Sequence, residues 1–194
     1  MIAPAQAATI TFDDIVVGSP NNIQTGVVSG GFNFTGPHFH IIDSPTTCST
    51  GCVSDGTQYM GEDAGNGVTM TPVGGGLFSL TSFEGAELFL GLSNASTIRI
   101  YGHLFGGSNV FADLFLDGLK DGAGGIPDFQ TFGIGWTNLT SVDFVGLGVD
   151  ANAISFSVDN IVVNTAVPEP FTLWLFGAGL AGAVAMRRRK AASA

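Results

Sequence analysis

Apolar and polar residues alternate in short runs along most of the chain, and glycine-rich segments separate these runs. Such alternation is typical of β-strands that bury one face. Residues 97–105 show it most clearly, because Ile98 and Ile100 alternate with Arg99 and Tyr101. No amphipathic helical pattern lies between the runs. The pattern predicts an all-β domain over residues 8–166, an antiparallel β-sandwich of the jelly-roll kind.

The predicted strands are short, as expected for a sandwich with many turns. Two segments between them, residues 43–56 and 118–128, are rich in turn-forming residues and are predicted loops. The alternating runs cover residues 9–17, 27–34, 38–42, 58–60, 67–71, 77–80, 86–92, 97–105, 110–116, 129–132, 139–147 and 153–163.

The first and last strands of the domain share an irregularity. In residues 9–17 the apolar positions change parity across Asp13 and Asp14, and in residues 153–163 they change across Asp159 and Asn160. Because a shift of one residue turns every side chain to the other face of a sheet, both strands are predicted to contain a bulge at the polar pair. The two near-identical segments, FDDIVV and VDNIVV, are predicted to lie near each other.

The same polar pairs suggest a metal site. Asp13, Asp14, Asp159 and Asn160, together with carbonyls of the bulges, could supply the oxygen ligands that Ca²⁺ prefers. The alternative is that these acids are solvated strand ends or charges that protect an edge strand. A structural calcium ion is the only cofactor that the sequence suggests.

The last 28 residues, 167–194, break with the strand pattern. An uncharged run over residues 171–186 would form a helix of about 24 Å at 1.5 Å per residue, a little short of the roughly 30 Å of bilayer hydrocarbon. It is predicted to be a transmembrane helix, with its basic end in the cytoplasm and the β-domain outside. The residues on either side of the run are Val167, Pro168, Glu169 and Pro170 before it, and Arg187, Arg188, Arg189 and Lys190 after it.

The order Val-Pro-Glu-Pro, apolar helix, basic cluster resembles the PEP-CTERM sorting signal of Gram-negative bacteria. The resemblance implies a partner, the membrane protease exosortase, which removes the signal near Pro-Glu-Pro. It also implies export across the inner membrane, transient anchoring with the outer domain in the periplasm, and delivery to the cell surface or beyond. Residues 1–7 are interpreted as the remnant of a secretory signal peptide, since Ala5-Gln6-Ala7 fits its cleavage rule.

The β-domain also resembles the outer domains that often precede this signal. The segments TITFDD, DGTQYM, LTSVDF and FSVDNIVV are similar to those of lectin-like or carbohydrate-module-like jelly rolls. That resemblance implies binding of extracellular polysaccharide, and a structural calcium ion near the terminal strands. Apart from phenylalanine, the aromatic candidates for contact with such a ligand are Trp136, Tyr59 and Tyr101. Trp136 and Tyr59 are the two proposed to bind it, although a tryptophan in a sandwich is more often part of the core.

Charge narrows the range of partners. The tail holds four of the six basic residues and one of the sixteen acidic residues. The domain is left with two basic and fifteen acidic residues, a formal charge near −13. Nucleic-acid binding depends on neutralising phosphates with Lys and Arg, so this partner is excluded. Cations are the natural counterions of such a surface.

The two cysteines and two of the histidines have simple interpretations. Cys48 and Cys52 lie in a polar loop, and outside the cytoplasm they are predicted to form a disulfide. His38 and His40 point to the same face of a predicted strand. His103 could come near this pair only through the tertiary fold. Such a pair is more often exposed or packed than part of a metal site.

None of the usual catalytic motifs occurs in the sequence. Glu84 and Glu87 could form a glycosidase-like carboxylate pair, but two acids alone are common. The sequence therefore favours a non-catalytic binding or structural protein associated with extracellular polysaccharide or a biofilm. The alternatives are a calcium-stabilised or self-assembling surface protein and, least favoured, a glycoside hydrolase.

Overall fold

The computed structural model describes residues 5–17, 23–43, 52–53, 56–89, 94–116, 129–148 and 153–166. Ala7–Thr165 form one compact unit, which contains nearly all of the described residues. The predicted transmembrane helix at residues 171–186 lies outside the described residues. Within the described ranges, no helix is long and apolar enough to cross a bilayer.

Ten strands account for most of the described residues, which contain no helix. The strands are β1 (Ala5–Ile10), β2 (Ile23–Ser29), β3 (Phe32–Ile42), β4 (Tyr59–Glu62), β5 (Val68–Pro72), β6 (Phe78–Glu87), β7 (Thr97–Leu104), β8 (Asn109–Phe115), β9 (Gln130–Leu147) and β10 (Phe156–Ala166).

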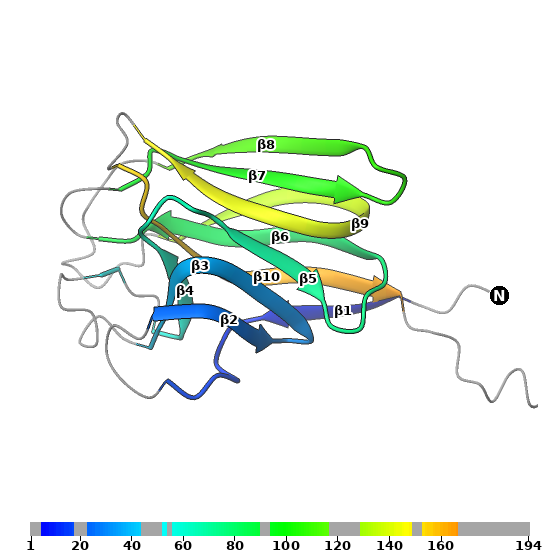
Figure 1. Cartoon of the computed structure of the whole chain (residues 1–194), viewed down its shortest axis with the longest axis horizontal. Helices are drawn as coiled ribbons and strands as arrows, with labels where there is room; N and C mark the ends of the chain where they lie inside the picture. Colours follow the sequence, from blue (N-terminus) through cyan, green and yellow to red (C-terminus); the bar gives the residue numbers. More distant parts are fainter. Residues whose placement is uncertain are drawn as a thin grey trace, which may run out of the picture. The chain divides into compact units, whose positions relative to one another are not determined.

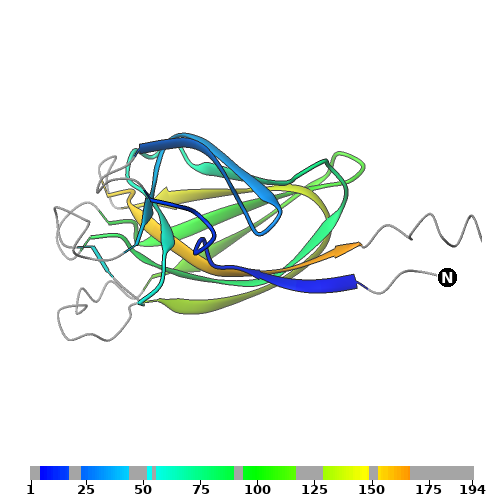
Figure 2. The ribbon, with the colours of Figure 1, turned by 90° about the horizontal axis from the view of Figure 1, so that it is seen from below.

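Six strands close into a ring, in the hydrogen-bonded order β10, β4, β3, β5, β9, β6 and back to β10. Every pairing around this ring is antiparallel. Outside it, β1 pairs with β10, β2 pairs with β3, and the β7–β8 hairpin extends the sheet from β9. The strands enclose a common interior in both ribbon views (Figure 1) (Figure 2). The all-β prediction is confirmed, but the hydrogen bonds continue around a ring instead of ending in the two separate sheets of the predicted sandwich.

Two long strands close the ring because each changes neighbour along one edge. This edge of β9 pairs with β6 over residues 130–139 and with β5 over residues 142–144. An edge of β3 likewise pairs with β5 over residues 32–35 and with β4 over residues 40–42. Strands that pass from one group of neighbours to another in this way form the corners of β-architectures.

The sequence pattern predicts two strands where β9 is continuous. The alternation of Phe132, Ile134 and Trp136, which pack against the core, carries the strand across the predicted gap. Gly135 and Asn138 adopt positive φ angles of 71° and 58°. A left-handed residue interrupts extended backbone, so the strand changes direction here without ending.

Aromatic side chains fill much of the interior. Phe12 and Phe34 meet edge to face with ring centroids 4.9 Å apart. Phe83 and Phe144 make a similar contact at 5.4 Å. All four side chains are fully buried. Burying a phenylalanine completely contributes about 1.5–3 kcal/mol, so these contacts are major contributions to folding.

The predicted bulge in the last strand is confirmed. The register between β10 and β6 shifts between Asp159 and Val162, and Asn160 adopts a φ of 48°. Val158 and Ile161 are consequently both buried in the core although they are three residues apart. The bulge keeps the apolar residues on either side of the polar pair facing inward.

The prediction for the first strand is wrong beyond Ile10, where β1 ends. The following residues form a turn in which the backbone N–H of Ile15 donates to the carbonyl of Phe12. Phe12 has a φ of 58°, yet its side chain remains in the core. Here the change of parity comes from a turn instead of a bulge.

A second, smaller cluster of buried side chains lies apart from the main core. Ile41 and Met60 belong to the main core, whereas the next residue of β3, Ile42, and the preceding residue of β4, Tyr59, belong to the second cluster. Since side chains alternate along a strand, this cluster covers the outer face of β3 and β4. His40 shares that face of β3.

Candidate functional site

One face of the β7–β8 hairpin presents aromatic and charged side chains. Arg99 pairs in register with Asp113, and Tyr101 with Phe111. Phe115 follows on the same face of β8, because it is two residues beyond Asp113. We call these five residues the aromatic face. The opposite face of the hairpin packs toward the core, with Ile98 and Ile100 buried, so the aromatic face is directed outward.

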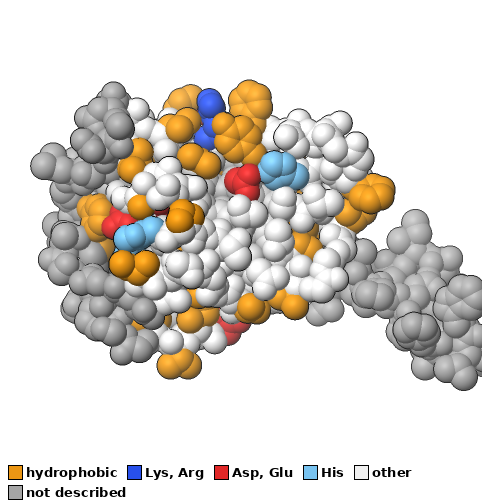
Figure 3. Space-filling view, viewed as in Figure 1, with side chains coloured by type: hydrophobic (Ala, Val, Ile, Leu, Met, Phe, Trp, Pro, Cys, Tyr) orange, Lys and Arg blue, Asp and Glu red, His pale blue; other side chains and the backbone are white. Residues whose placement is uncertain are grey.

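The exposure of this face is unusual for its residue types. Phe111 and Phe115 expose 64% and 73% of their surfaces, and Phe105, in the turn after β7, exposes 73%. These are the only phenylalanines among the large exposed apolar residues of the described chain. The space-filling view shows orange side chains grouped around a basic one over β7 and β8 (Figure 3). Apolar surface grouped in this way marks sites of interaction more often than a single exposed residue does.

Charge–charge and aromatic contacts fix the geometry of this face. The Arg99 guanidinium donates from Nε to Asp113 Oδ1 at 2.5 Å and from Nη2 to Oδ2 at 2.7 Å. It also lies 5.4 Å from the centroid of the Phe111 ring, a cation–π distance. The hydrogen bonds from Arg99 hold the pKa of the Asp113 carboxyl below its ordinary value. The aromatic rings are therefore presented on an ordered, charged surface.

Polar groups continue the same face onto β9. Asp143 lies opposite Tyr101 in the β7–β9 register. Its Oδ1 accepts from Thr69 Oγ1 at 2.6 Å, and its Oδ2 is 2.7 Å from His103 Nε2. The surface thus combines aromatic rings with hydrogen-bonding groups, as ligand sites commonly do.

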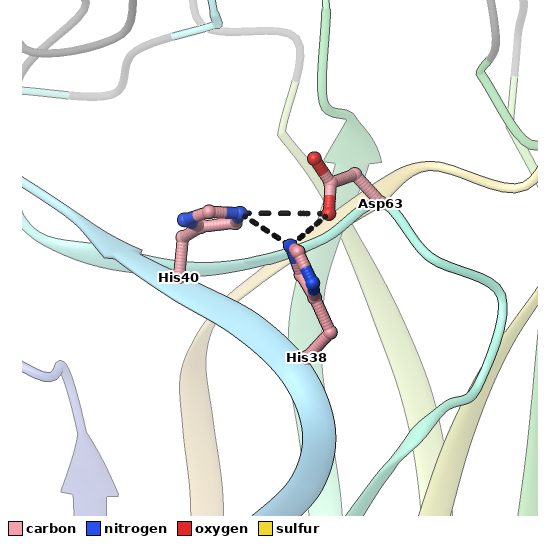
Figure 4. Close-up of side chains that lie close together, drawn as sticks. All are labelled: His38, His40 and Asp63. Carbon is pink, nitrogen blue, oxygen red and sulfur yellow. Dashed lines mark hydrogen bonds and ion pairs between the residues drawn. The ribbon is translucent and has the colours of Figure 1, made fainter. Parts of the chain in front are cut away.

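A different cluster gathers two histidines and an aspartate, and we call it the histidine cluster. His38 and His40 are on β3, and Asp63 directly follows β4. The two Nε2 atoms are 3.1 Å apart, and they lie 3.1 Å (His38) and 3.5 Å (His40) from Asp63 Oδ1. The three atoms turn toward one another (Figure 4). In the described part of the chain, this is the one group of three or more His, Cys, Asp or Glu side chains close enough to hold a metal ion together.

The pairing of β3 with β4 explains why these residues meet. His40 pairs with Gly61, so continuing the antiparallel register places Asp63 opposite His38. The neighbouring Glu62 is buried, and its Oε1 accepts the backbone N–H groups of Ala64 and Asn66. Burial raises the pKa of Glu62, whereas the hydrogen bond with His40 lowers the pKa of Asp63 despite partial burial.

The aromatic residues predicted to bind a ligand lie elsewhere. Tyr59 is fully buried and donates its hydroxyl hydrogen to the carbonyl of Val53, so its ring offers no stacking surface in this structure. Trp136 is partly buried against the core, where its ring fills the space beside Gly102. Both side chains pack inside the domain, and other residues form the exposed aromatic surface.

The side chains of the four predicted calcium ligands have partners in three different places. Asp14 accepts from Ser29 Oγ and the backbone N–H of Gly30. Asp13 accepts the backbone N–H of Gln58, and Asp159, which is fully buried, accepts from Thr57 Oγ1.

The remaining predicted ligand, Asn160, donates from Nδ2 to Glu84 Oε2 at 2.9 Å. Asp13 and Asp159 thus approach the same short segment, residues 57–58, while Asp14 holds a separate turn. The calcium site stays a prediction.

Two further predicted pairs are the carboxylates Glu84 and Glu87 and the cysteines Cys48 and Cys52. Glu84 accepts from Thr131 and Asn160, and Glu87 is buried. In their regular pairing with β10 they are three residues apart, so their side chains point to opposite faces of β6. Cys52 is buried and is not a free thiol. Cys48 lies outside the described residues, so its pairing with Cys52 stays a prediction.

The tail matches a known protein-family motif. Residues 166–190 match the PEP-CTERM protein-sorting motif. They include the predicted residues Val167 to Pro170 and Arg187 to Lys190. No curated protein matches the chain significantly. The PEP-CTERM motif indicates an exported protein that exosortase, a membrane protein, processes on a membrane-anchored route toward the cell surface.

The PEP-CTERM motif indicates a sorting route, and it assigns no role to the aromatic face or the histidine cluster, neither of which the sequence pattern predicted. The sequence pattern did not single out Phe111 or Phe115 as exposed residues. Their shared parity with Asp113 was the available signal, because an acid within an apolar stripe indicates an outward face. Asp63 left no comparable signal, since its approach to His38 depends on the pairing of two strands separated by a long loop.

Proposed function

We propose that this chain is a non-catalytic surface protein that binds extracellular polysaccharide through the aromatic face. The observation behind the proposal is the outward pair Phe111 and Phe115, together with Tyr101 and the Arg99–Asp113 ion pair. A pyranose ring has apolar C–H faces and hydroxyl groups at its rim. Aromatic rings can cover the former, while charged and polar side chains can hydrogen-bond the latter.

The sorting route supports this proposal. A PEP-CTERM protein is delivered toward the cell surface, where it can meet extracellular polysaccharide. Repeating polymers suit an open face, because many weak contacts along one chain add up through multivalency. An open face beside a strand edge admits a long chain, which a closed pocket would exclude.

Charge restricts the polysaccharide class. The outer domain carries a formal charge near −13, with Arg99 as one of its two basic residues. Arg99 is already neutralised by Asp113. A strongly anionic polymer would be repelled by this field, so we propose a neutral or weakly charged polysaccharide as the ligand.

The test uses the full chain in a detergent that carries no sugar headgroup, so that the detergent cannot compete for the face. Affinity electrophoresis through gels containing neutral or acidic polysaccharides reports retardation directly. Wild-type protein should be retarded by at least one neutral polysaccharide. Phe111→Ala and Phe115→Ala should each weaken this retardation about tenfold or more, since each removes one stacking ring.

Phe105→Ala is the matched control, because Phe105 is as exposed as Phe115 but lies in the turn outside the two strand rows. It should leave the retardation unchanged. Equal losses for Phe105→Ala and Phe111→Ala would mean unspecific adhesion by exposed phenylalanine. A wild-type chain that migrates identically in every gel would refute the proposed binding function.

A further inference from the structure

We propose that His38, His40 and Asp63 form a binding site for one divalent transition-metal ion of the zinc class. The proposal is independent of the aromatic face. It rests on the convergence of two imidazole nitrogens and one carboxylate oxygen on a single point, as drawn in the close-up view (Figure 4).

Protons alone cannot satisfy the contacts in this cluster. Each Nε2 carries at most one hydrogen, and the ionised carboxylate carries none. If both rings donate to Asp63 Oδ1, the two nitrogens face each other as donors at 3.1 Å with no acceptor between them. If one ring carries its hydrogen on Nδ1 instead, its Nε2 lone pair faces the carboxylate oxygen. One contact of the three is therefore repulsive in every arrangement, whereas a central cation would accept all three lone pairs.

The distances fit a small ion. Ligands about 2.0–2.1 Å from a tetrahedral zinc lie roughly 3.3–3.4 Å from one another. The three edges of the histidine cluster measure 3.1, 3.1 and 3.5 Å. Adjustments of a few tenths of an ångström would thus complete the coordination, with no change of rotamer. The size of the triangle does not exclude Ca²⁺, but two of the three donors are imidazole nitrogens, whereas Ca²⁺ prefers oxygen ligands.

The donor set points to the same class of ion. Imidazole suits zinc, copper, iron and nickel, whereas calcium and magnesium select oxygen. Three protein ligands leave a fourth position open, as in zinc sites that also hold water or a substrate. The side chains of His38 and Asp63 keep 32% and 27% of their surfaces exposed, so a solvent molecule can reach this position.

The backbone segments around the histidine cluster pack closely against each other. Phe39, between the two histidines, is fully buried and fixes this part of β3. A Cβ atom on Gly36 would lie 2.7 Å from the carbonyl oxygen of Gly67, so the segments that carry the histidines and Asp63 touch through bare backbone. Glu62 holds the start of the second segment through its hydrogen bonds to the backbone of residues 64 and 66. The ligands are therefore positioned before any ion arrives, which favours binding.

The experiment is zinc titration of the full chain, prepared without a histidine tag and stripped with EDTA. Isothermal titration calorimetry should show one Zn²⁺ per chain, and Zn²⁺ should raise the thermal midpoint because it binds only the folded state. His40→Gln and Asp63→Asn should each weaken zinc binding roughly 100-fold or more, given that even groups behind the ligands commonly change metal affinity by 10–100-fold. Co²⁺ bound at the site should show the intense visible absorption of a four-coordinate complex.

His103→Gln is the matched control. His103 also pairs with a carboxylate, at 2.7 Å from Asp143, but it belongs to no group of three ligands among the described residues. Its loss should leave the zinc affinity unchanged. The near-isosteric Asp63→Asn keeps the test decisive if a histidine variant fails to fold. Binding below one ion per chain, equal affinity in Asp63→Asn and wild type, or an equally tight response to Ca²⁺ would each overturn the proposal.

Discussion

The bulge of β10 supports a quantitative prediction at Asn160. This residue has a φ of 48°, and its side-chain Nδ2 donates to Glu84 Oε2 at 2.9 Å. Two contributions to stability are thus combined at one position, the left-handed backbone and a hydrogen bond to a charged group. Replacement by glycine removes only the second, while replacement by alanine removes the hydrogen bond and also places a Cβ atom in the left-handed region.

The magnitudes follow from these contributions. A hydrogen bond to a charged group is worth about 1.5–3 kcal/mol, and the lower end applies because the pair is only part-buried. Asn160→Gly should therefore lower the free energy of unfolding by about 1.5 kcal/mol. Asn160→Ala should lower it by about 2.5 kcal/mol or more, since a non-glycine residue without a local polar side chain costs about 1 kcal/mol or more in the left-handed region.

Asn138 provides the comparison. It has a φ of 58° and an exposed side chain, so only the backbone contribution applies there. Asn138→Gly should stay within about 0.5 kcal/mol of wild type, and Asn138→Ala should cost about 1 kcal/mol. Urea unfolding of the four variants, followed by circular dichroism, measures these differences.

The reasoning would be refuted if Asn160→Gly were as neutral as Asn138→Gly. The measurements should also be repeated in EDTA and in calcium. A role as hydrogen-bond donor predicts the same loss in both, whereas a loss seen only in calcium would return Asn160 to the predicted metal ligands.

Two further predictions concern the core and the aromatic face. Phe34→Ala should lower the free energy of unfolding by about 3–5 kcal/mol because this side chain is fully buried, whereas Phe115→Ala, at 73% exposure, should change it by less than about 0.5 kcal/mol. Arg99→Ala should raise the pKa of Asp113 toward its ordinary value of 3.8, as measured by carboxyl NMR titration. Because the folded-state pKa of Asp113 is lowered, its contribution to stability is present above pH 3.8 and is lost as the pH falls through the folded-state value; an unchanged titration in Arg99→Ala would contradict the assignment.

The alternation of apolar and polar residues predicted the parts of the fold that depend on local sequence, such as the bulge in the last strand. The change of parity at Asp159 and Asn160 is produced by a bulge, whose extra residue keeps Val158 and Ile161 both in the core. The same change at Asp13 and Asp14 was produced by a turn. A parity change reports that the backbone rotates and does not say how. Closure of the ring was beyond this reasoning, since it depends on which strands pair.

The candidate sites divide in the same way. The shared face of His38 and His40 follows from their spacing, but the third ligand arrives through the register of β3 with β4. The outward direction of Phe111 could have been inferred from Asp113, whereas its contact with Arg99 depends on the register of β7 with β8. Residue spacing therefore identified which side chains share a strand face, and strand pairing determined which of them form a site.

The closed ring has a consequence for when the protein folds during export. Two of its six junctions, β10 with β4 and β10 with β6, depend on the last strand of the described residues. β10 ends at Ala166, where the matched sorting motif begins. A chain translocated from its N-terminus therefore cannot complete its barrel until β10, which directly precedes the sorting motif, has been translocated. The strand that completes the ring is thus the one next to the sorting motif, so loss of β10 together with the motif would leave the ring open.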